Sequence, residues 1–168
     1  AHWSEVGENY DTNIASLNFR AAMLSLLSKV RGLNLDVIHL TIGNDGLHVN
    51  NAENTTKRGT KQDVDGRFYK VFDIAAKNYE WAIDKALEVA ETVYCPLIAG
   101  NHAPDQEILL AKYIKAVYRK EPRVNIDDRP ISRKAYHFGR NLILHTHGDG
   151  LNINDLAHIL PLEFPKQW

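Results

Sequence analysis

The stretch Leu97-Ile98-Ala99-Gly100-Asn101-His102-Ala103-Pro104-Asp105 decides how this chain is interpreted. An uninterrupted apolar run over 93–99 predicts a buried strand, because strands that are covered on both faces lack polar alternation. The run stops at a glycine, and an amide and an imidazole follow directly. In open α/β sheets, ligands bind beyond the carboxyl ends of the strands. We therefore expect a functional site just after Gly100.

Two other apolar runs end in the same way. The run over 37–42 opens into Gly43-Asn44-Asp45-Gly46-Leu47-His48, and the run over 142–144 opens into His145-Thr146-His147-Gly148-Asp149. Asp, Asn and His side chains supply oxygen and nitrogen ligands for Mn, Fe, Zn or Mg. Three strand ends that each carry such residues predict a divalent-metal site.

The segments between these strands predict an α/β layered domain, with a sheet and flanking helices. Helical spacing of apolar residues predicts helices over 12–30, 66–91, 105–119 and 152–160. A short strand is expected over 123–126, and 134–144 is typical of a hairpin that turns at Gly139. The 36–42 strand should be covered on both faces.

The first helix has a clear start and a broad apolar side. Asp11 or Thr12 can cap it, since a short side-chain oxygen accepts a free backbone N–H, and Gly32 can end it. The face expected to point inward consists of Ile14, Leu17, Ala21, Leu24 and Leu27, widened by Phe19, Met23, Leu26 and Val30.

Length and composition narrow the class of protein. A chain of 168 residues is one domain's length, and its net charge of −1 gives no general attraction to nucleic acid or to anionic membranes. No apolar run approaches the ~20 residues of a membrane span, and the polar first residues do not form a signal peptide. The single Cys95 lies in a predicted strand, which favours a reducing, cytoplasmic setting.

The long polar segment 43–66 carries Lys57, Arg58 and Lys61. Loops of this length inside a domain are usually functional or disordered. Two interpretations stay open: the cations bind phosphate, or the segment is simply solvated. The basic side of the 105–119 helix is most simply solvated.

The motifs resemble those of the calcineurin-like metallophosphoesterases. Gly100-Asn101-His102 after a buried strand is similar to the family's Gly-Asn-His-Asp/Glu motif, and Asp45-Gly46-Leu47-His48 to its Gly-Asp-x-x-Asp/Asn/His motif. His147-Gly148-Asp149 looks like the His-Gly segment that supplies a further ligand. The 43–66 loop and the opening Gly7-Glu8-Asn9-Tyr10-Asp11 resemble phage or prophage members.

The resemblance implies a role for each matching residue. Asp45 would be the bridging carboxylate, Asn101 and His147 would bind metal, and His102 would act as general acid. Residues that would lie beside the metal or face the substrate are His48, Asp105, Asp149, His145, Lys57 and Arg58. The implied function is a metal-dependent phosphoester hydrolase, of phosphodiesterase or nuclease type, that uses Mn²⁺, Fe, Zn or Mg and a metal-activated water. Its substrate would be a phosphoester, such as a nucleic acid or nucleotide.

The chain also departs from the family pattern. Nothing before Asp45 offers the family's first Asp-x-His motif, and nothing after Asp149 offers its last Gly-His-x-His motif. Ala103 replaces the acid after Gly-Asn-His, so Asp105 would have to substitute. We therefore expect residues 1–168 to form a single, partial metallophosphoesterase-like domain, incomplete at both ends, with one metal site.

Other interpretations remain open beside this one. The chain can be a non-catalytic scaffold or binding module with a degenerate metal site, or it can gain missing strands and ligands from a second chain or from a homo-oligomer. A metal-free nucleotide-binding domain lacks support, because no glycine-rich phosphate loop occurs. His145 can fill a core position and His48 a loop position, and His39 and His137 are expected to be structural.

Overall fold

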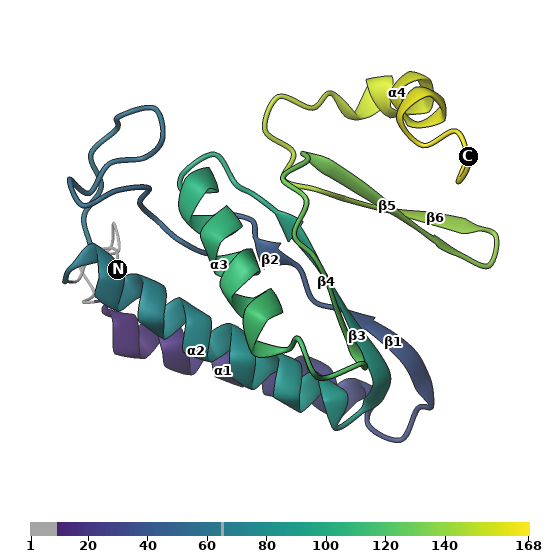
Figure 1. The fold of residues 1–168 in the computed structure, drawn as a ribbon, viewed down its shortest axis with the longest axis horizontal. Helices are drawn as coiled ribbons and strands as arrows, with labels where there is room; N and C mark the ends of the chain where they lie inside the picture. Colours follow the sequence, from purple (N-terminus) through teal and green to yellow (C-terminus); the bar gives the residue numbers. More distant parts are fainter. Residues whose placement is uncertain (1–9, 65) are drawn as a thin grey trace.

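The computed structural model describes residues 10–64 and 66–168. Four helices flank a mostly parallel sheet, and an antiparallel hairpin stands beside it, which confirms the α/β class (Figure 1). The helices are α1 Thr12–Val30, α2 Phe68–Leu87, α3 Pro104–Val117 and α4 Leu156–Glu163, with a short 3-10 turn η1 at Ile153–Asp155. The strands are β1 Leu35–His39, β2 Ile42–Gly43, β3 Ala90–Ile98, β4 Val124–Asp127, β5 Arg133–Phe138 and β6 Asn141–Thr146.

Strand β3 is the centre of the parallel sheet. Its residues Val93 and Tyr94 pair with β1 and also with β4, so these two strands lie on opposite sides of β3. Strand β2 pairs with the end of β3 in the same register that β1 uses at its start. Strands β1 and β2 are therefore two parts of one edge strand, and both direct their carboxyl ends toward the same edge as β3.

The prediction of one unbroken strand over 36–42, buried on both faces, was wrong in two respects. The strand is interrupted at Leu40 and Thr41, although the Leu40 N–H still bonds to the Tyr94 carbonyl at 2.9 Å. Asp36 is exposed and the rest of β1 is only half-buried. The reason is that β1 lies at an edge, where helices cover only one face.

Helices α2 and α3 cover that face and form the main core. Ile83, Leu110 and Ile114 from these helices pack with Val93 and Leu97 of β3, and all five side chains are fully buried. Burial of this apolar area is the main force that holds the helices on the sheet. Helix α3 therefore supports the carboxyl ends of β2 and β3.

Helix α1 packs on α2 rather than on the sheet, and its buried face differs from the predicted one. Leu17 and Leu24 are 68% and 50% exposed, whereas Leu27 is buried and Phe19 packs against Tyr79 with ring centroids 6.0 Å apart. Asp11 does cap this helix, because its carboxylate accepts the Ile14 N–H at 2.8 Å. A helix that packs on a single neighbour buries only a narrow stripe, so four of the nine residues expected inside are exposed: Leu17, Ala21, Leu24 and Leu26.

The hairpin of β5 and β6 covers part of the other face of the sheet (Figure 1). It confirms the predicted hairpin, with Gly139 at φ +58° in the turn between Phe138 and Asn141. Its rings of Tyr136 and His145 pack against His39 of β1 and Tyr94 of β3. This contact brings the end of β6 to the edge where β2 and β3 end.

No helix within the described ranges is long and apolar enough to cross a membrane. Of the opening segment that resembles phage members, only Tyr10 and Asp11 lie within the described residues.

Candidate metal-binding site

The turn after β2 presents Asp45 in an unusual backbone conformation. Gly43, Asn44 and Asp45 all have positive φ angles, of 97°, 57° and 60°. A Cβ at position 43 would lie 2.5 Å from the Ile98 carbonyl oxygen, so the turn requires glycine there. Asn and Asp tolerate the left-handed region better than other side chains do. Such strained backbone persists only where the surrounding structure fixes it, and it is frequent at functional sites.

The turn after β3 lies directly against the Asp45 turn. A Cβ on Gly100 would stand 1.9 Å from the Asp45 carboxylate, so only glycine fits between the two turns. The backbone N–H of His102 donates to Asp45 Oδ1 at 2.9 Å. The sheet register and this hydrogen bond together place Asp45 beside Asn101.

His147 reaches the same point from the end of β6. Its Nε2 lies 2.8 Å from Asn101 Oδ1 and 3.2 Å from Asp45 Oδ2, and its Nδ1 lies 2.8 Å from Asn44 Oδ1. Asp45 and His147 keep 27% and 20% of their side-chain surface exposed. Three predicted ligands from three separate strand ends therefore meet at a point open to solvent.

This donor set fits a single divalent cation. Adjacent ligands around a metal with bonds of about 2.1 Å stand about 3 Å apart, close to the separations of 2.8 and 3.2 Å between Nε2 of His147 and the two oxygens. Each ring nitrogen of His147 has a side-chain oxygen at 2.8 Å. Within the described ranges, no three His, Cys, Asp or Glu side chains form a possible metal site, so a site here would need the amide of Asn101 as its third ligand.

The rings of His102 and His48 lie next to each other. Their ring centroids are 5.5 Å apart, and both side chains are half-buried. The backbone of His102 also accepts the Lys57 N–H at 2.9 Å, so the long 43–66 loop is attached at this position. His102 is thus held from two sides, by Asp45 and by Lys57.

Asp105 anchors the loop rather than joining the three ligands. Its carboxylate accepts hydrogen bonds from Lys57 Nζ and from Asn50 Nδ2, the latter at 2.7 Å. The bond from Lys57, and then the one from Asn50, hold the pKa of Asp105 below its ordinary value. The Asp105 carboxylate therefore binds the 43–66 loop through Asn50 and Lys57.

Arg58 and Asp149 form a weak contact across the site. The guanidinium lies 3.6 Å from the carboxylate and is 77% exposed. This distance favours an ion pair screened by water, which contributes little to stability. Arg58 therefore remains available to a negatively charged ligand.

His145 does not reach the three ligands. Its Nε2 bonds to Nδ1 of His39 at 2.8 Å, and Tyr94 and Tyr136 surround the pair. Burial lowers the pKa of both rings, with help from His145 for His39 and from Lys134 for His145. His145 was expected either beside the metal or in the core, and these contacts support the core position.

The His39–His145 pair makes stability depend on pH. Both rings have pKa values below the ordinary 6.5, so the unfolded chain binds more protons, and the free energy of unfolding falls as the pH drops below 6.5. We expect His39→Asn to flatten this fall in urea unfolding measured at several pH values. His137→Asn, at an exposed position of β5, should leave the fall unchanged. Equal pH dependence in wild type and His39→Asn would contradict the prediction.

Glu107 is a site residue that the sequence reasoning missed. It is fully buried, and its Oε2 accepts the Gly100 N–H at 2.6 Å while its Oε1 accepts the Leu47 N–H at 3.3 Å. Burial raises its pKa to about 7, although the hydrogen bonds from Gly100 and Leu47 oppose the shift. The sequence held one signal for this role, since Glu107 precedes the inward-facing Leu110 and Ala111 by one helical turn.

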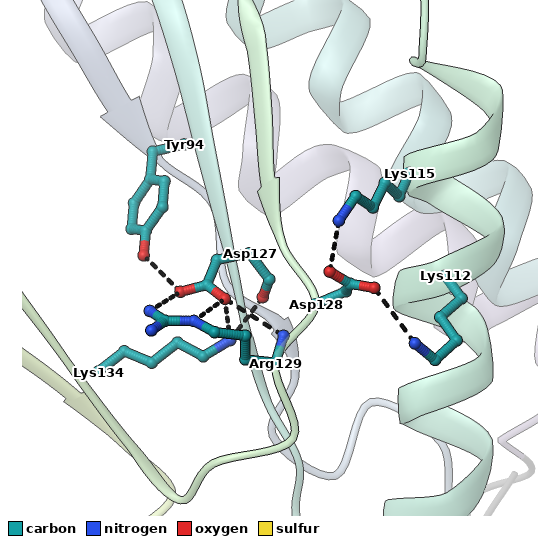
Figure 2. A network of polar contacts seen from close by, with 7 residues as sticks. All are labelled: Tyr94, Lys112, Lys115, Asp127, Asp128, Arg129 and Lys134. Carbon is teal, nitrogen blue, oxygen red and sulfur yellow. Dashed lines mark hydrogen bonds and ion pairs between the residues drawn. The ribbon is translucent and has the colours of Figure 1, made fainter.

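A second missed group holds the hairpin against the sheet (Figure 2). Lys134 of β5 is 1% exposed, and its Nζ donates to the Asp127 carbonyl and lies 3.2 Å from the Asp127 carboxylate. Arg129 donates to both oxygens of that carboxylate, at 2.9 and 2.6 Å, and Tyr94 donates at 3.2 Å. Burial opposes ionisation of Asp127, but the bonds from Arg129 and Lys134 hold its pKa well below the ordinary value.

Comparison of the chain with protein-family models, with curated proteins and with solved structures finds no match.

Proposed function

We propose that the protein is a metal-dependent phosphoester hydrolase that binds one divalent cation, Mn²⁺ in the first instance, through Asp45, Asn101 and His147. The observation that carries this proposal is the convergence of three side chains from segments far apart in the sequence. Nε2 of His147 lies 2.8 Å from Oδ1 of Asn101 and 3.2 Å from Oδ2 of Asp45. We also propose that the parallel sheet and the hairpin correspond to the two sheets of a metallophosphoesterase-like sandwich.

The residues around the site support hydrolysis. Hydrolysis of a phosphoester forms a bond between water oxygen and phosphorus, breaks the ester P–O bond and transfers a proton to the leaving oxygen. A bound divalent cation supplies Lewis acidity and a more acidic water. Asn44 accepts from Nδ1 of His147, which fixes the ring and directs Nε2 to the site.

His102 is the proposed general acid. Its backbone N–H donates to Asp45 Oδ1 at 2.9 Å, and its half-buried ring packs against His48. A positioned imidazole can deliver a proton to the leaving oxygen. Lys57 and Arg58 on the adjacent loop supply positive charge on the substrate side, and Arg58 can exchange its 3.6 Å contact with Asp149 for a phosphate.

A calorimetric titration with MnCl₂ tests the metal site. We expect one Mn²⁺ per chain for the wild type and no measurable binding for Asp45→Asn, because the substitution removes the only carboxylate of the three ligands. Asp36→Asn, at an exposed position on β1, is the matched control and should bind as the wild type does. Phosphodiesterase activity on bis(p-nitrophenyl) phosphate should appear with Mn²⁺ and disappear with a chelator. Activity that survives chelation would overturn the proposal.

The second candidate function is a non-catalytic binding module that retains the fold without the chemistry. It is favoured by the donor set, in which Asp45 is the one carboxylate and no second group of ligands occurs within the described ranges. It predicts no manganese binding and no rise in melting temperature with manganese, since a ligand stabilises only the state that it binds. A second copy or another chain that adds strands and ligands would restore metal binding in the assembled form.

A further inference from the structure

A cavity of about 340 Å³ opens directly beside the proposed metal ligands. Asn101 and His147 form one end of it, the start of α3 forms one side, and the segment between β4 and β5 forms the other. Cavities that bind small ligands range from about 300 to about 1,000 Å³. This cavity is at the lower end of that range, so it can hold one compact group rather than several linked units.

Apolar side chains from two elements contribute to a lining that is otherwise polar. Pro104 and Ile108 line it from α3, and Pro130 and Ile131 line it from the β4–β5 segment. The hydroxyl-bearing Ser132 adds a hydrogen-bonding group between them. A lining that combines apolar side chains with hydrogen-bonding groups suits a small organic ligand that has both apolar and polar parts.

The charged side chains of the cavity already have partners. Arg133 donates from Nε to Glu163 at 2.7 Å and makes a second bond to the same carboxylate. Asp149 lies 3.6 Å from Arg58. A further phosphate in the cavity would meet Asp149 and no unpaired cation among the residues that line it, so the cavity favours a neutral occupant.

We propose that this cavity binds the nucleoside of a nucleotide ester whose phosphate lies at Asn101 and His147. The proposal rests on the proposed function and narrows its substrate class to esters with one nucleoside-sized group beside the reacting phosphate. The interior phosphates of a nucleic-acid strand, with charged neighbours on both sides, are then poorer substrates than single nucleotide esters.

Two esters with the same leaving group test the cavity: thymidine 5′-(p-nitrophenyl phosphate) and methyl p-nitrophenyl phosphate. With Mn²⁺ we expect kcat/KM to be at least about tenfold higher for the thymidine ester, within the range that apolar pockets discriminate. Ile131→Trp fills the cavity from a position that is 42% exposed, so it should abolish the preference for the thymidine ester. The matched control is Leu109→Trp, which lies on α3 outside the cavity at 53% exposure and should keep the preference.

Calorimetric binding of thymidine 5′-monophosphate separates this proposal from the proposed function. Binding that is weakened about tenfold by Ile131→Trp and unchanged by Leu109→Trp supports the cavity even if neither ester is hydrolysed. Hydrolysis of both esters with equal kcat/KM overturns the cavity proposal while the hydrolase proposal stands. Hydrolysis of bis(p-nitrophenyl) phosphate as efficiently as the thymidine ester overturns the nucleoside assignment.

Discussion

Replacing Glu107 with glutamine is expected to lower the free energy of unfolding by about 2–3 kcal/mol and to weaken manganese binding at least about tenfold. Both oxygens of the buried carboxyl accept backbone N–H groups, one from Gly100 and one from Leu47. Glutamine keeps one acceptor and turns an NH₂ group toward the other N–H. One of the two turns that carry Asp45 and Asn101 then loses its support.

Urea unfolding and manganese calorimetry measure the two effects of Glu107→Gln. Glu91→Gln, on an exposed position of β3, is the control and should change neither quantity. Unchanged metal affinity in a destabilised Glu107→Gln would mean that the carboxyl supports the fold without positioning the ligands. Wild-type stability in Glu107→Gln would contradict the role of both hydrogen bonds.

The stability difference between wild type and Glu107→Gln should depend on pH. The pKa of Glu107 is raised from 4.5 to about 7, so the folded state binds the extra proton, and the stabilisation by Glu107 falls as the pH rises through this interval. The difference in stability between wild type and Glu107→Gln should therefore shrink between these pH values. The contribution of the His39–His145 pair to stability changes with pH in the opposite direction. This contribution is the same in wild type and Glu107→Gln, so it cancels when their stabilities are subtracted.

The second large effect is expected for Lys134→Met. Removing one partner of a buried ion pair typically costs about 3–5 kcal/mol, because the other charge stays buried with less compensation. Arg129 still binds Asp127 in this variant, so we expect a loss near the lower end, about 3 kcal/mol. Because Lys134 attaches β5 to the end of β4, the hairpin should also loosen and His147 should leave the site.

Lys112→Met is the matched control for Lys134→Met (Figure 2). Lys112 also pairs with an aspartate, Asp128, but it is 56% exposed, and such pairs contribute at most about 1 kcal/mol. Denaturant unfolding gives the stability of both variants, and manganese calorimetry gives the metal affinity. Equal effects of the two substitutions would show that burial of Lys134 does not matter.

The sequence predicted the class of the fold and the meeting of three strand ends, for a physical reason. Buried parallel strands leave long apolar runs, and the carboxyl ends of such strands share one edge, so Asp45 and Asn101 had to be neighbours. The hairpin was recognisable from its turn at Gly139, whereas its docking on the sheet, which brings His147 to Asp45 and Asn101, was not. These inferences use only local patterns and one rule about sheets.

The remaining features depend on contacts between distant residues. Helix α1 showed apolar residues on most of its surface, and periodicity could not tell which stripe packs against α2, so Leu17 and Leu24 were wrongly expected inside. Glu107 and Lys134 are buried charges, which a search for apolar periodicity treats as surface residues. His145 and His147 carry the same side chain two positions apart, and only the docking of the hairpin separates their environments.

The constant register of β1 and β2 against β3 determines where the chain tolerates changes in length. Asp45 reaches Asn101 because β1 and β2 pair with β3 in one continuous register up to Gly43. One residue inserted between β1 and β2 would move Asp45 by about 3.3 Å and turn it to the opposite face of the sheet. The loop after Asp45 is attached at Leu47, Asn50 and Lys57, whereas a side chain at Gly59 would meet no atom within 4 Å. Loop extensions, affinity tags or grafted peptides therefore belong around Gly59, whereas the segment before Asp45 must keep its length.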